Sequence, residues 1–198
     1  MGVLHLIYRA SEFGSCAAGV CAAVLLAHAA QAEPNIKRTI VYYDVGGATV
    51  QELRDDIFSK GPLIEGRRFG ALTHSNVKWG YKYRPGANGC AITSVTTEVS
   101  LTITLPRLNG GTAPVEAAFN VFMENLMVHE NGHVDIAVRN ARQIEQRIGA
   151  LPPEKTCDRV SNAANAIGKA LIEDGSREQK AYDAKTQHGT TQGAQLRR

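Results

Sequence analysis

The sequence has no strong excess of charge of either sign and no run of lysine or arginine. Its 22 basic and 19 acidic residues leave a formal net charge of +3 over 198 residues. Binding to nucleic acid or to an anionic membrane surface depends on concentrated positive charge, so this balance argues against both partners. With 43% hydrophobic and 21% charged residues, the composition is that of an ordinary globular protein.

Cysteine is scarce, and the C-x-x-C spacing that is common in zinc sites is absent. Only Cys90 and Cys157 lie outside an N-terminal segment that we expect to be removed. Two cysteines in an exported protein are expected to pair, so we predict a Cys90–Cys157 disulfide rather than a pair of zinc ligands. Closing a loop of that length stabilises a fold by roughly 4 kcal/mol through the lost entropy of the unfolded chain.

The N-terminal segment has the pattern of a secretory signal peptide. Arg9 precedes an apolar stretch of small residues at 16–26, and Ala-Gln-Ala at 30–32 forms an A-x-A cleavage site. We therefore predict that residues 1–32 are removed after Ala32 and that the protein is periplasmic or secreted. The apolar stretch is too short to span a bilayer comfortably, so no membrane span is expected in the mature chain.

No repeat, low-complexity tract or linker divides the rest, so we expect one domain at 33–198 with a polar, frayed tail after about residue 189. A β-rich run at 36–45 precedes a helical pattern at 49–59, and 71–83 again has the pattern of a strand. The clearest strand is 95–105, where apolar and polar residues alternate. That alternation predicts a sheet with one solvated face.

The hydrophobic period then changes from two to about 3.6 residues. Apolar residues recur at steps of three or four across 112–149, which predicts one helix of about 35 residues. Gly132 within it would permit a bend or the close approach of another segment. Two further helices are expected at 158–173 and 176–187. The expected fold class is α+β and zincin-like: a small antiparallel or mixed sheet packed on a long active-site helix and following C-terminal helices.

The long helix carries the segment His129-Glu130-Asn131-Gly132-His133. Histidines four residues apart project from one helix face, so two imidazoles can bind one Zn²⁺. Glu130 is rotated by about 100° from His129, away from the metal but within reach of a water bound to it. Two ligands and a general base in this H-E-x-x-H arrangement are typical of a zinc metallopeptidase. The alternative is a pair of core histidines that are hydrogen-bonded to backbone.

A catalytic zinc usually takes three protein ligands and keeps one open position. The metzincin pattern is excluded, because isoleucine and arginine stand where that class has a glycine and a third histidine after His133. The richest remaining segment is 182–189. Within it we favour His188 as the third ligand, with Asp183 as the alternative. Tyr182 is a candidate hydrogen-bond donor to the developing oxyanion.

Further motifs occur along most of the mature chain. They are Tyr42-Tyr43-Asp44-Val45, the Gly61-Pro62 turn, Trp79, Leu105-Pro106, the H-E-x-x-H segment, and Tyr182-Asp183-Ala184-Lys185-Thr186-Gln187-His188-Gly189. In these motifs the chain resembles the predicted secreted bacterial Zn-dependent proteases, a domain-of-unknown-function family. The last motif is similar to the family's Y-D-x-x-T-x-H-G. This resemblance implies functional roles for Asp183, Thr186 and His188.

The sequence thus predicts an exported Zn²⁺-dependent metallopeptidase in which Glu130 activates a zinc-bound water against a peptide or protein substrate. The amphipathic strand 95–105 is the candidate for pairing with an extended substrate, as in zincin metallopeptidases. Two alternatives stay open, namely a zinc amidase acting on cell-wall peptides and a non-catalytic zinc-binding module of the cell envelope. A closed site that uses both His188 and Asp183 as ligands would favour the module. Oligomeric state does not follow from the sequence.

Overall fold

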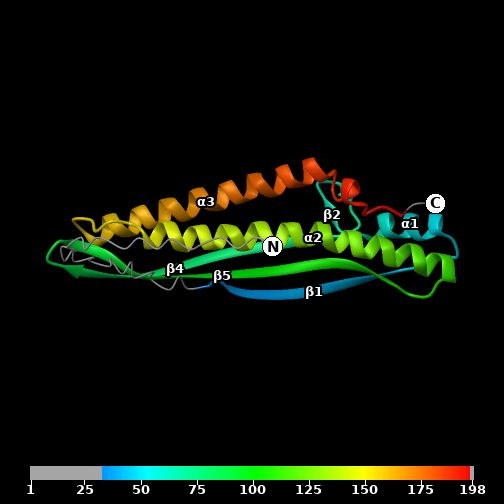
Figure 1. The fold of residues 1–198 in the computed structure, drawn as a ribbon, viewed down its shortest axis with the longest axis horizontal. Helices are drawn as coiled ribbons and strands as arrows, with labels where there is room; N and C mark the ends of the chain where they lie inside the picture. The colour runs from blue at the N-terminus through cyan, green and yellow to red at the C-terminus, as the bar shows by residue number, and fades with distance from the viewer. Residues whose placement is uncertain (1–32, 197–198) are drawn as a thin grey trace, which may run out of the picture. The chain divides into compact units, whose positions relative to one another are not determined.

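One mixed sheet of three strands forms the base of the fold (Figure 1). The computed structural model describes residues 33–196, so the predicted signal peptide lies outside the described residues. β1 (Asn35–Val45) pairs parallel with β5 (Gly89–Leu108), and β4 (Leu72–Gly86) pairs antiparallel with β5. The strand order is therefore β1-β5-β4, with β5 in the centre.

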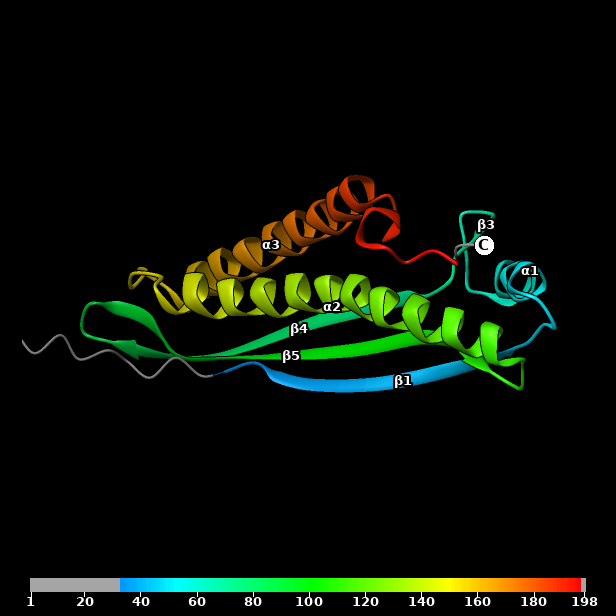
Figure 2. The ribbon, with the colours of Figure 1, turned by 45° about the vertical axis from the view of Figure 1, so that its right-hand side comes forward.

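Two long helices cover one face of this sheet (Figure 2). α2 (Ala113–Gly149) lies along β5 and β4, and α3 (Cys157–Thr186) returns antiparallel to α2. The remaining elements are α1 (Val50–Lys60), the two short strands β2 (Leu63–Ile64) and β3 (Arg67–Arg68), and the 3-10 helix η1 (Thr190–Gln192). The predicted α+β class and small sheet are confirmed, and α2 is the continuous long helix predicted at 112–149. None of the helices within 33–196 has the length and apolar character needed to cross a bilayer.

The alternating pattern of β5 determines which face α2 covers. The alternating apolar residues Val99, Leu101, Ile103 and Leu105 are at most 2% exposed. They pack against buried residues of α2, with small alanines in the C-terminal half of that helix and phenylalanine and leucine in its N-terminal half. One apolar strand face and one apolar helix stripe therefore share a core, as the period change in the sequence predicted.

The helices predicted at 158–173 and 176–187 are one continuous helix, α3. Gly175 lies at the predicted break, and a Cβ there would come 3.0 Å from the side-chain amide of Asn140 on α2. The Asn140 amide donates a hydrogen bond to the Leu171 carbonyl at 2.6 Å. The glycine therefore permits close packing of two helices instead of ending one of them.

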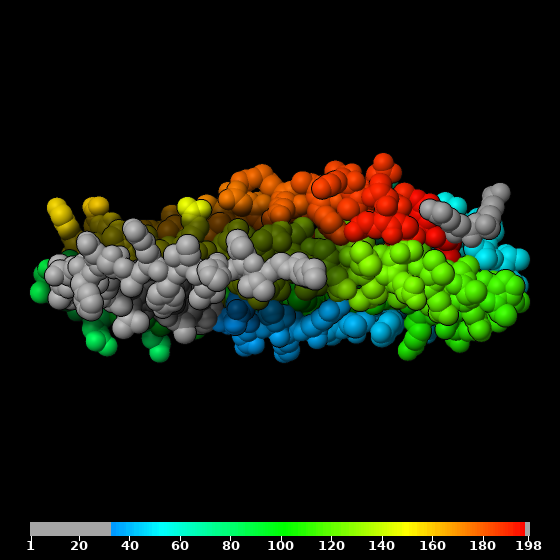
Figure 3. All heavy atoms as spheres, in the orientation of Figure 1, coloured from blue at the N-terminus to red at the C-terminus, as the bar shows by residue number. Residues whose placement is uncertain are grey.

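Residues 190–196 fold back onto the domain and do not form the frayed tail that we expected after residue 189. Leu196 is 7% exposed and belongs to the cluster that contains Phe122 and Leu126 of α2. In the space-filling view the red residues before position 197 lie against α2 (Figure 3). The segment after residue 189 is mostly polar, but the burial of Leu196 and the turn of η1 give it a defined structure.

Cys90 and Cys157 form the predicted disulfide, with their Cα atoms 5.0 Å apart. The bond joins the start of β5 to the start of α3. Beside it, the Cys90 and Glu154 backbones exchange two hydrogen bonds of 2.7 and 2.9 Å. The disulfide and these two hydrogen bonds attach the loop between α2 and α3 to the sheet. They limit how far the two helices can shift relative to each other.

Candidate metal centre

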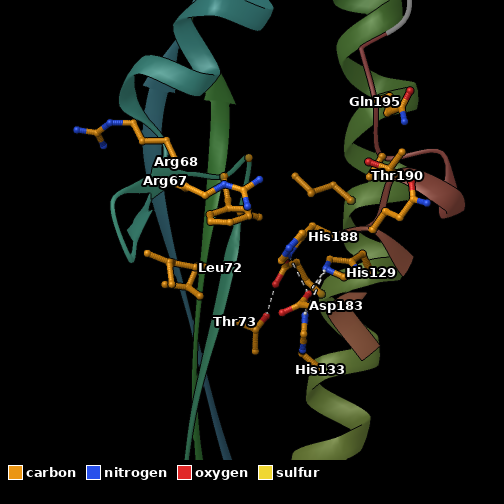
Figure 4. A pocket seen from close by; sticks show the side chains of 18 of the residues that line it. Arg67, Arg68, Leu72, Thr73, His129, His133, Asp183, His188, Thr190 and Gln195 are labelled. Atoms are coloured by element: carbon orange, nitrogen blue, oxygen red, sulfur yellow. Dashed lines mark hydrogen bonds and ion pairs between the residues drawn. The ribbon is translucent and has the colours of Figure 1, made fainter. Parts of the chain in front are cut away.

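Side chains from α2 and α3 converge on one point (Figure 4). His129, His133 and Asp183 each offer a ligand atom, and these atoms lie within 4.8 Å of one another. The Nε2 atoms of His129 and His133 are 3.3 Å apart. Asp183 Oδ1 lies 3.3 Å from His129 Nε2 and 3.1 Å from His133 Nε2. A triangle of this size has its centre about 1.9 Å from each corner, which is close to the usual Zn–N and Zn–O distances. The donor set fits zinc.

Two glutamines fix the orientation of the imidazoles. Gln192 Oε1 lies 3.0 Å from Nδ1 of His129, and Gln179 Oε1 lies 2.5 Å from Nδ1 of His133. The side-chain amide nitrogens of both glutamines have other partners. The Gln179 nitrogen donates to the His133 carbonyl, and the Gln192 nitrogen donates to the Tyr182 hydroxyl. Because an amide oxygen only accepts, both Nδ1 atoms carry the proton. Each imidazole can then bind a metal only through Nε2, once the Nε2 proton that it donates to Asp183 in the metal-free protein is lost.

Glu130 lies beside the three donors. It is 2% exposed, and its Oε2 accepts a 2.6 Å hydrogen bond from the Thr73 hydroxyl on β4. A cleft of about 550 Å³ opens next to it, lined on one side by residues 70–75 and on the other by the metal cluster. In Figure 4, Thr73 faces Asp183 and the two histidines across this cleft.

The pKa values of the two carboxylates move in opposite directions. Burial raises the pKa of Glu130, and the hydrogen bond from Thr73 offsets this only in part. Burial would also raise the pKa of Asp183, but hydrogen bonds from His129 and His133 lower it overall. Carboxylates with such divergent pKa values suit different tasks, because a ligand must stay ionised whereas a general base works best near the ambient pH.

Of the two candidate third ligands, the geometry favours Asp183 over His188. His188 lies outside the three-donor cluster, with its Nδ1 3.3 Å from Asp183 Oδ1. Its ring packs on Phe69 at a centroid distance of 4.7 Å, and its side chain is 45% exposed. Gln187, His188 and Gly189 all have positive φ, which turns the chain sharply after α3 and carries His188 to the wall of the cleft.

The Tyr182 side chain, which the sequence offered as a donor to an oxyanion, lies against α2 and outside the lining of the cleft. Its ring stacks on His129 at 5.1 Å, and its hydroxyl donates to the His129 carbonyl at 3.2 Å. The ring lies directly over Gly132, where an added Cβ would overlap the hydroxyl and its ring carbon. The expectation that Gly132 permits a close approach is confirmed, and the approaching residue is Tyr182.

Gly132→Ala is expected to destabilise the protein, although alanine favours a helix by about 1 kcal/mol over glycine. The methyl group would push Tyr182 and α3 away from α2, and overpacking of this kind typically costs about 1–3 kcal/mol. Urea unfolding should show a net loss of stability. In a Tyr182→Ala background the same substitution should be neutral or stabilising, because the obstructing ring is gone. An equal loss in both backgrounds would contradict this explanation.

Residues 40–189 match a family that is described as bacterial protein of unknown function (DUF922). This match spans more than half of the chain and contains every donor of the metal cluster. The chain belongs to the DUF922 family. No curated protein and no solved structure matches it. The description of the DUF922 family names no activity.

Sequence reasoning missed three residues of the DUF922 site, namely Gln179, Gln192 and Thr73. One signal was available, since Gln179 lies four residues before Asp183 and so shares its face of α3. No spacing rule could have found the other two. Gln192 follows three left-handed residues, and Thr73 reaches Glu130 from a strand that is 57 positions away in sequence.

Proposed function

We propose that this chain is an exported, zinc-dependent metallopeptidase with a zincin-like site. One observation carries the proposal: two imidazole Nε2 atoms and one carboxylate oxygen surround a point of the right size for Zn²⁺, with a buried glutamate beside it. The cluster borders a cleft, so an open position for substrate is available. Export depends on the predicted signal peptide at 1–32 and stays a prediction.

The residues around this point have separate tasks. Bound Zn²⁺ would supply a water of lowered pKa and would polarise the carbonyl of the substrate. Glu130, which is buried beside the three donors, would act as the general base that takes a proton from the attacking water and passes it to the leaving amine. The Thr73 hydroxyl holds the carboxylate in place through its 2.6 Å hydrogen bond. Gln179 and Gln192 keep both histidines in the tautomer that binds metal.

The free edge of β4 supports a peptide as substrate. From the sequence we expected an extended substrate to pair with residues 95–105. That segment lies in β5, the central strand, whose two edges are paired with β1 and β4. β4 is an edge strand in the sheet of the described residues, and its first residues line the cleft beside Glu130. An extended peptide can join such an edge through main-chain hydrogen bonds. β4, and not β5, is therefore the strand that is available to pair with a substrate peptide.

Metal content and hydrolysis measured together test the proposal. The purified protein is expected to bind one zinc ion per chain and to hydrolyse casein or a mixed peptide library. A chelator should remove both properties, and added Zn²⁺ should restore them. Purified cell wall, digested in parallel, separates a peptidase from a cell-wall amidase. A protein that takes up no zinc, or a zinc-loaded protein that cleaves neither substrate, would contradict the proposal.

A further inference from the structure

The wall of the cleft that faces the metal centre carries positive charge without matching negative charge. Arg54 of α1 and Arg67 and Arg68 of β3 line it. Among the described residues that line the cleft, the only carboxylates are those of Glu130 and Asp183, which already belong to the metal site. Within residues 33–196, none of the three arginines forms an ion pair with a carboxylate. The wall therefore has cationic groups available for a ligand.

The two arginines of β3 differ in what they contact. The Arg68 guanidinium donates a 2.6 Å hydrogen bond to the carbonyl of Gly61, at the C-terminal end of α1. It thus serves the fold. Arg67 lies over the Phe69 ring, with 5.7 Å from the guanidinium carbon to the ring centroid. In Figure 4 Arg67 extends toward His188, whereas Arg68 is directed out of the cleft.

A series of contacts connects Arg67 to the metal centre. Arg67 packs on Phe69, Phe69 packs on His188 at 4.7 Å, and His188 Nδ1 is 3.3 Å from Asp183 Oδ1. Stacking on an aromatic ring orients a guanidinium and leaves its N–H donors free. A planar carboxylate can accept two of these donors at once, which makes such pairs both strong and geometrically selective.

We propose that Arg67, assisted by the charge of Arg54, selects peptides with an aspartate or glutamate side chain close to the bond that is cleaved. A peptide that extends along the edge of β4 projects side chains toward the walls of the cleft, where Arg67 meets the acidic one. This inference rests on the proposed function, because it assigns the substrate class of the same cleft.

Peptide binding tests the proposal independently of catalysis. The probe is a series of fluorescent peptides, capped at both ends, in which one glutamate is scanned along an otherwise neutral sequence. Matching series carry glutamine or lysine instead. Binding to the zinc-loaded Glu130→Gln variant is measured by anisotropy at low salt, because salt screens exposed charges. The end caps ensure that a terminal carboxylate does not mimic the side chain.

At the preferred position, the glutamate peptide is expected to bind about tenfold more tightly than its glutamine counterpart, with lysine weakest. Adding Arg67→Gln should remove this difference, and Arg67→Glu should favour lysine. Arg84→Gln is the matched control, since Arg84 is exposed on β4 and does not line the cleft. Equal binding of all three series, a preference that survives Arg67→Gln, or no binding of any peptide would overturn the proposal.

The two proposals can fail separately. If the parent protein hydrolyses peptides regardless of their charge, the peptidase function stands and the role of Arg67 is refuted. If the Glu130→Gln variant prefers glutamate peptides through Arg67 but the parent cleaves nothing, the selectivity stands and the peptidase function is refuted.

Discussion

Glu130→Gln is expected to abolish peptide hydrolysis and to leave the zinc content unchanged. Glutamine has nearly the same shape as glutamate and can still accept a hydrogen bond from the Thr73 hydroxyl. Its amide cannot take a proton from water, however, and the loss of a positioned general base typically costs a factor of about 10²–10⁴ in rate. The measurement is kcat on a peptide substrate, together with metal analysis of the same preparation.

The buried position of Glu130 makes this result specific. Burial raises the pKa of Glu130 above the ordinary value of a glutamate, and a higher pKa makes the carboxylate a stronger base. Glu124 on the same helix is exposed and does not line the cleft, so Glu124→Gln should keep the parental rate. A Glu130→Gln protein that hydrolyses peptides as fast as the parent would remove Glu130 from the mechanism.

The first part of the site could be predicted because it is local in sequence. His129, Glu130 and His133 lie within two turns of one helix, so helix periodicity alone sets their relative directions. The same holds for β5, whose alternation identifies the buried face. Alternation says nothing about which strands are neighbours, and for that reason the central position of β5 was not foreseen.

The third ligand depends on how two helices cross, which no local rule gives. Asp183 reaches the histidines because α3 is unbroken and packs closely on α2 where Tyr182 meets Gly132. Because we expected α3 to be interrupted, the direction of the Asp183 side chain could not be derived, and the sequence favoured His188 over Asp183 as the third ligand. Composition likewise concealed Gln192 in a segment that looked like a solvated tail.

Asp183→Ala is expected to lower zinc affinity by more than about 100-fold. Loss of a residue that only hydrogen-bonds to a metal ligand typically lowers metal affinity by about 10–100-fold, and loss of a ligand itself should cost more. Asp183 Oδ1 lies within 3.3 Å of both Nε2 atoms, so its removal leaves only two donors on one helix. His188→Ala is the matched control. His188 lies beside Asp183 but outside the cluster, so this variant should still bind one zinc ion per chain.

Thermal unfolding gives a second readout of the same assignment. A ligand that binds only the folded state raises Tm, so added Zn²⁺ should stabilise the parent and the His188→Ala variant equally. The Asp183→Ala variant should show a much smaller zinc-dependent shift at the same zinc concentration. The opposite pattern, with zinc lost in His188→Ala and retained in Asp183→Ala, would restore His188 as the third ligand. It would also require α3 to end in a different orientation when metal is bound, because His188 now packs on Phe69 at the cleft wall.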